Sequence, residues 1–143
     1  MQISRKMCMV ALEWCMEKYG KSPYRRAYPL LRFRTKAIKC SETKDFLSGE
    51  YDWKGNQIWI YGTLHQKEKD PVLSVVNTII HEYKHYLQNM QNYEMYLEVY
   101  QYTYDTHPYE ITCNRFAEKE QYECYYHVIK KMKKKKRNLT YSK

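Results

Sequence analysis

Apolar side chains recur at helical spacing in three stretches of the chain: residues 3–19, residues 72–90, and a stretch that runs from residue 108 into a series of lysines. The first stretch stops at Gly20. The second follows Asp70-Pro71, a good helix opening because proline fits the first turn, where its missing N–H costs nothing. The third follows His107-Pro108 and contains no glycine or proline. The pattern therefore predicts an N-terminal, a central and a C-terminal helix.

Between the first two helices the pattern changes to an alternation of apolar and polar residues. It does so over residues 30–40, which suits a half-buried strand. Two further strand-like runs, residues 46–53 and 57–61, flank a turn built on Gly55 and Asn56. These runs predict a small antiparallel sheet with a hairpin, and hence an α+β fold. Residues 91–106 are dense in tyrosine and fit both helix and extended chain, so we interpret them as a connector.

The charge of the chain is concentrated at one end. The 143 residues carry a net charge of +9, but eight positive charges and no acid lie in residues 130–143. Residues 1–129 are therefore nearly neutral, and we predict that they form one domain followed by a basic tail. Such a tail suits a solvated helix end or a disordered arm, and the run Lys130–Arg137 also permits weak, salt-sensitive contact with nucleic acid or another polyanion.

Two features bear on where the protein works. No run reaches the eighteen apolar residues that a membrane span needs, and the N-terminal apolar stretch lacks a signal-peptide cleavage site. The five cysteines are odd in number, widely spaced and free of CxxC pairs, which argues against both a disulfide framework and a cysteine-based zinc site. We expect no membrane contact and a cytoplasmic location, in a bacterial cell or a phage-infected host.

The central helix contains the motif His81-Glu82-x-x-His85. Residues four apart on a helix share one face, so both histidines can reach one metal ion. Glu82 points to an adjacent position, where its carboxylate can touch a metal-bound water without binding the metal. Zinc lowers the pKa of such a water towards neutrality, and Glu82 would take its proton as a general base during attack on a carbonyl.

A catalytic zinc site has three protein ligands and an open position, so a third ligand is needed. No histidine lies six residues beyond His85, which leaves a glutamate on a following helix as the familiar solution. Glu110 is the best placed, because small residues (Cys113, Asn114 and Ala117) line the helix face that carries it and permit close helix approach. Its alternative role is to cap the helix. His107 is the rival third ligand.

The segments "HEYKHYLQ" and "HPYEITCNRFAEK" together resemble the HExxH and downstream glutamate motifs of minimal gluzincin metallopeptidases, especially the ImmA/IrrE-like group. The resemblance covers about residues 57–120. It implies a zincin-like fold in which His81, His85 and Glu110 hold one Zn²⁺ ion and Glu82 is the base. It also implies that an edge strand before the active-site helix, here residues 56–61, binds the backbone of a peptide substrate.

One residue departs from the family pattern: Cys113 stands where alanine is usual, and this puts a thiol near the expected metal. Asn114 can hydrogen-bond a ligating histidine. No spacing selects an oxyanion-stabilising residue, although Tyr109 and the nearby tyrosines are candidates.

The sequence therefore predicts zinc-dependent peptide hydrolysis. The alternative is an inactive zincin-like binding or structural protein whose basic tail contacts nucleic acid or an acidic partner.

Overall fold

The computed structural model describes residues 2–36, 38–39 and 46–141. It is an α+β fold, as predicted, with five helices and five short strands in these residues. The helices are α1 (Arg5–Tyr19), α2 (Gly62–Gln66), α3 (Pro71–Leu87), α4 (Met90–Glu98) and α5 (Pro108–Tyr141). The strands are β1 (Leu30–Arg34), β2 (Ile38–Lys39), β3 (Phe46–Leu47), β4 (Gly49–Asp52) and β5 (Gln57–Tyr61).

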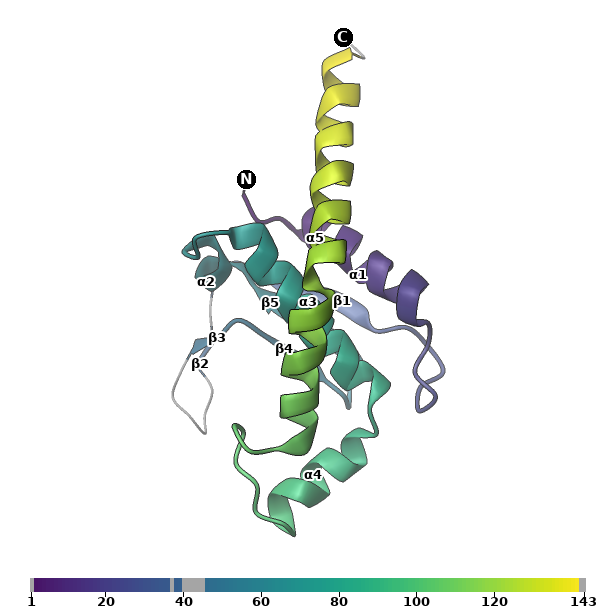
Figure 1. The fold of residues 1–143 in the computed structure, drawn as a ribbon, viewed down its shortest axis with the longest axis vertical. Helices are drawn as coiled ribbons and strands as arrows, with labels where there is room; N and C mark the ends of the chain where they lie inside the picture. Colours follow the sequence, from purple (N-terminus) through teal and green to yellow (C-terminus); the bar gives the residue numbers. More distant parts are fainter. Residues whose placement is uncertain (1, 37, 40–45, 142–143) are drawn as a thin grey trace.

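The three predicted helices are confirmed, and local capping explains where two of them begin. The Ser4 hydroxyl accepts a hydrogen bond from the backbone N–H of Met7 at the start of α1. The Asp70 carboxylate does the same for Leu73 at the start of α3, and Pro71 occupies the first turn. α5 continues through the lysine-rich segment to Tyr141, and Figure 1 shows its C-terminal part extending beyond the rest of the molecule.

The main sheet has the strand order β1-β5-β4 and is mixed. β4 and β5 form the predicted antiparallel hairpin, but β1 pairs with β5 in parallel, so the prediction of an antiparallel sheet is wrong for this pair. The alternating pattern indicated which face of each strand is buried; it contains no information about strand direction. The prediction that residues 56–61 form the edge strand is also wrong, because the alternating pattern does not distinguish an edge strand from a central one. β5 is the central strand, and β4 is the edge strand beside α3.

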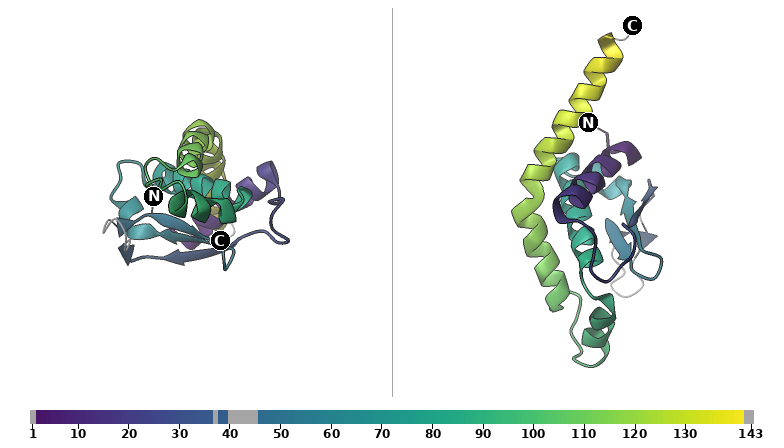
Figure 2. Two further views of the ribbon diagram at one scale, coloured as in Figure 1. Left: turned by 90° about the horizontal axis from the view of Figure 1, so that it is seen from below. Right: turned by 90° about the vertical axis from the view of Figure 1, so that its right-hand side faces the viewer.

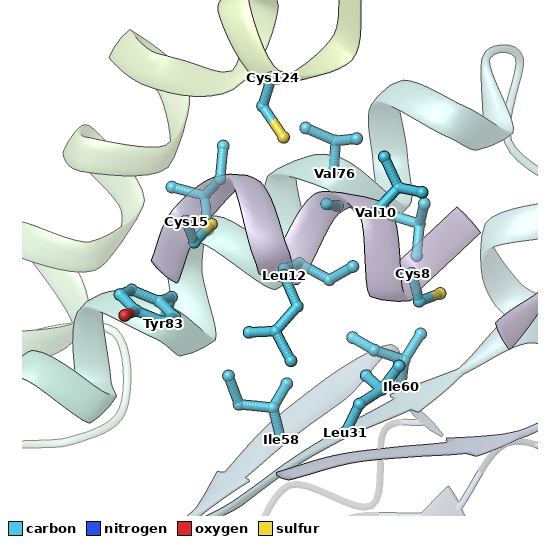
Figure 3. Close-up of a cluster of buried hydrophobic side chains, with 14 of the residues drawn as sticks. Cys8, Val10, Leu12, Cys15, Leu31, Ile58, Ile60, Val76, Tyr83 and Cys124 are labelled. Carbon is cyan, nitrogen blue, oxygen red and sulfur yellow. The ribbon is translucent and has the colours of Figure 1, made fainter. Parts of the chain in front are cut away.

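The helices cover one face of this sheet in two layers, with α1 and α3 next to the strands and α5 outside them (Figure 2). Buried side chains from the sheet and from both helix layers form the core, among them Ile58 of β5, Leu12 of α1, Val76 of α3 and Cys124 of α5 (Figure 3). Cys8, Cys15 and Cys124 are buried here as free thiols. This agrees with the interpretation of the cysteines as small apolar residues; Cys40 lies outside the described residues.

The segment 91–106, which we interpreted from the sequence as a connector, contains most of a helix, α4. The side chain of Asn89 caps this helix by accepting a hydrogen bond from the N–H of Gln91. Residues 99–107 then form a loop that leads into α5. Among the helices of the described residues, none combines the length and the apolar character that a membrane span requires.

Candidate metal centre

His81, Glu82 and His85 lie on the buried side of α3, and Glu110 reaches them from the first turn of α5. The Nε2 atoms of both histidines lie 2.9 Å from the same Glu110 oxygen, Oε1. All four side chains are buried, with residue exposures between 4% and 7%. The structure thus brings together the four residues that the sequence predicted for the site.

The separation of these atoms fits a shared metal ion. Zinc–nitrogen bonds of 2.0–2.1 Å in tetrahedral geometry place neighbouring ligand atoms about 3.3 Å apart. The observed 2.9 Å between each Nε2 and Glu110 Oε1 is close to this spacing. Two imidazoles and a carboxylate are also a donor set that zinc commonly accepts. These contacts are also of hydrogen-bond length, so the Glu110 carboxylate would have to move outward to admit an ion between the three ligand atoms.

Cys113 adds a thiol to this group. Its sulfur and one ring nitrogen each of His81 and His85 all lie within 4.8 Å of one another, and all three residues are buried. Since imidazole nitrogen and thiolate sulfur are both zinc ligands, these three side chains form a group that can bind a metal ion.

Three further side chains support the predicted ligands; the sequence singled out His107 among them only as a rival ligand, and did not single out the other two. The amide oxygen of Gln88 accepts a hydrogen bond from Nδ1 of His85 at 2.9 Å, which leaves Nε2 facing the centre. Tyr93 donates from its hydroxyl to Glu110 Oε2 at 2.6 Å, so it holds the carboxylate oxygen that the histidines do not contact. The third side chain, that of His107, holds Tyr93.

The proposal of His107 as the third ligand is wrong, because both of its ring nitrogens are used elsewhere. Nδ1 accepts a hydrogen bond from the N–H of Tyr109 at 3.0 Å, so Nε2 carries the proton and donates to the carbonyl of Tyr93, also at 3.0 Å. The imidazole stacks on the Tyr93 ring with 3.9 Å between centroids. His107 therefore fixes the position of Tyr93, and through it that of Glu110.

The predicted role of Asn114 is not realised. Asn114 lies on the exposed side of α5, and Gln88 makes the hydrogen bond to His85 that was expected from it. The hydroxyl of Tyr109 accepts a hydrogen bond from Asn92 and so lies on the α4 side of this segment. Tyr104 is about half exposed as a residue, but its hydroxyl is desolvated near Glu110 and Glu82, and this desolvation and the two charges raise the pKa of the hydroxyl.

The pKa values of the two carboxyl groups of the site are shifted in opposite directions. Burial raises the pKa of Glu82 to about 7, and the partly opposing charge of His81 does not cancel this effect. Burial alone would also raise the pKa of Glu110, but the hydrogen bonds with His81 and His85 outweigh it and hold this pKa well below its usual range. Glu110 is thus the carboxylate suited to bind a cation, and Glu82 the one suited to exchange a proton.

Comparison of the chain with protein-family models, curated proteins and solved structures found no match. The site is therefore interpreted from its own geometry. The resemblance to gluzincin peptidases, which rests on the motif residues, stays a prediction.

Loss of the Tyr93 hydroxyl is expected to weaken metal binding. We expect Tyr93→Phe to lower zinc affinity by about 10- to 100-fold, the usual effect of removing an outer partner of a metal ligand. Competition with a chromophoric chelator measures this change. Tyr96→Phe is the matched control, because Tyr96 lies on the same helix and packs on His107 and Tyr109. Equal affinity in the two variants would show that the Tyr93 hydroxyl does not support Glu110.

The raised pKa of Glu82 predicts a pH-dependent stability in the metal-free protein. The folded state holds the Glu82 proton up to about pH 7, whereas the unfolded chain releases it near the ordinary value of 4.5. A carboxyl group with a raised folded pKa stabilises the fold below the unfolded value, and this contribution is lost as the pH rises to the folded value. At 1.36 kcal/mol per pH unit, the loss is on the order of 3 kcal/mol.

Glu82→Gln removes this titration and keeps the shape of the side chain. In urea denaturation after chelation of metal, we expect the variant and the native protein to have similar stability at pH 4, below the unfolded pKa. At pH 8 we expect the variant to be more stable by roughly 2–3 kcal/mol. A stability difference that does not change between the two pH values would contradict the assignment of the raised pKa to Glu82.

Proposed function

We propose that this protein is a zinc-dependent peptidase in which His81, His85 and Glu110 hold the metal and Glu82 is the general base. One observation carries the proposal. Nε2 of His81 and Nε2 of His85 on α3 contact one carboxylate oxygen of Glu110, which lies 25 residues after His85 on α5, and Glu82 is buried beside them. A bound zinc ion would polarise a scissile carbonyl and lower the pKa of a coordinated water.

The position of Glu82 supports its proposed role in proton transfer. One of its carboxylate oxygens lies 3.8 Å from Nε2 of His81, so the group is adjacent to the centre without occupying the ligand position of Glu110. The backbone of Tyr51 in β4 is near the Glu82 carboxyl and lowers its pKa slightly, against the larger effect of burial. A base whose pKa lies near the working pH takes and returns a proton efficiently.

The edge strand supports a peptide as substrate. Because β4 packs against α3, the helix of Glu82, and among the described residues has a main-sheet partner only on its β5 side, an extended peptide can pair with its other side. Such pairing would lay the peptide backbone along α3, next to the base. β4 thus takes the role that the sequence assigned to residues 56–61.

Access to the buried centre is expected through α4 and the loop that follows it. No side chain of α4 is buried, and Val99, Tyr100, Tyr102 and Tyr104 in the loop are exposed. Segments with so few buried contacts open at low cost in free energy.

The free, buried thiols of the described cysteines suit the expected cytoplasmic location.

Removal of the metal tests the proposal. We expect protein incubated with a strong chelator and then desalted to lose hydrolysis of casein, an unfolded polypeptide substrate, and to regain it when one equivalent of zinc is added. Hydrolysis that survives chelation would contradict a metal-dependent mechanism. Zinc binding without hydrolysis of casein or of a peptide library would favour the alternative, a binding or structural protein built on this scaffold.

A further inference from the structure

Cys113 lies at the centre, and the proposed peptidase mechanism does not use its thiol. It follows Glu110 by three residues on α5, and residues at this spacing share one helix face. Its side chain is fully buried, and its sulfur lies within 4.8 Å of a ring nitrogen of both His81 and His85. The thiol therefore shares the helix face of Glu110 and lies near the rings of both histidines.

A hydrogen bond links the thiol to the same group of ligands. The sulfur of Cys113 lies 3.6 Å from Oε1 of Gln88, the atom that also accepts the hydrogen bond from His85. If the thiol left this contact for a metal ion, Gln88 would keep its hydrogen bond with His85. The structure thus allows the thiol to change partner without releasing the histidine.

The number of protein ligands decides what such a centre can do. Zinc centres with four protein ligands are closed and structural, whereas catalytic centres keep one position for water or substrate. His81, His85 and Glu110 account for three positions. A thiolate in the fourth would exclude water, and sulfur is a ligand that zinc binds readily.

We propose that Cys113 is a fourth metal ligand that closes the centre in a resting state and is displaced when the peptidase works. This inference rests on the proposed function, since it concerns the same centre. In the closing step the S–H bond breaks and its proton passes to solvent. The sulfur binds the metal, and one water molecule leaves the coordination position. In the opening step a water molecule or the substrate carbonyl replaces the sulfur, which takes up a proton again.

Cobalt substitution of the full chain tests the proposal without a substrate. Co²⁺ has a near-ultraviolet charge-transfer band when a thiolate binds it, and imidazole and carboxylate ligands do not produce this band. We expect the Co²⁺-loaded native protein to show the band, and Cys113→Ala and Cys113→Ser to lose it while they still bind the ion. Cys124→Ala is the matched control, because it removes another buried thiol from the same helix; it should retain the band.

Hydrolysis gives a second readout. We expect Cys113→Ala to cleave casein faster than the native protein, because its centre cannot close. Co²⁺ bound through His81 and Glu110 without the charge-transfer band in the native protein would overturn the role of Cys113 and leave the peptidase proposal standing. Failure of the native protein to bind Co²⁺ or Zn²⁺ at all would overturn both.

Discussion

Glu82→Gln is expected to lower kcat/KM for peptide hydrolysis by about 10²- to 10⁴-fold, the range that a positioned general base contributes. The amide is similar in shape to the carboxyl group but cannot take a proton from water. Since Glu82 is not among the predicted ligands and lies 3.8 Å from Nε2 of His81, the variant should keep its metal. The loss should therefore appear in the rate and leave the metal content unchanged.

The control for this variant is Glu118→Gln, which makes the same chemical change at an exposed position on α5. Rates of casein hydrolysis and metal content are measured on the same preparations of all three proteins. If Glu82→Gln retained the native rate with its metal bound, Glu82 would not be the base. If it lost the metal, the carboxylate would be a ligand, and its assigned role would be wrong for that reason.

Glu110→Ala is expected to lower zinc affinity by more than about 100-fold. Loss of an outer partner of a ligand already lowers metal affinity by about 10- to 100-fold, and Glu110 is a predicted ligand itself. One oxygen of this carboxylate contacts both histidines, so the alanine variant lacks the group that lies between them. Without Glu110, the two imidazoles and the Cys113 thiol are the remaining candidate ligands, and the centre has lost its carboxylate.

Glu110→Gln separates charge from shape in the same experiment. The amide oxygen is a poorer zinc ligand than a carboxylate. The zinc affinity of Glu110→Gln should therefore fall between that of Glu110→Ala and that of the native protein. Glu118→Ala, two turns further along α5 and exposed, should bind zinc like the native protein. Native affinity in Glu110→Ala would show that the third ligand lies elsewhere, and Cys113 would be the first residue to test.

Site residues that lie on one helix, and the helices themselves, were predictable from the sequence. His81 and His85 are one turn apart, so helical geometry alone places them together. Glu110 was a harder case, because its approach to α3 depends on the packing of two helices. The small buried side chains at Cys113 and Ala117 were the signal for this approach.

Features that depend on contacts between distant segments were not predictable in this way. The alternating pattern of β5 is the same in a central strand as in an edge strand, so it did not show that β4 lies at the edge. Tyr93 lies in a tyrosine-rich segment where no spacing distinguishes it from its neighbours. Gln88 did carry a signal, since it follows His85 by three residues at the end of the same helix.

The central claim is that the two histidines of α3 and the glutamate of α5 bind one metal ion. The most direct test is the metal content of the full chain, purified without added zinc and then again after zinc supplementation, measured by elemental analysis beside His81→Ala. We predict about one equivalent of zinc in the native protein and almost none in the variant. Native protein that holds no metal after supplementation, or a variant that holds as much as the native protein, would contradict the claim.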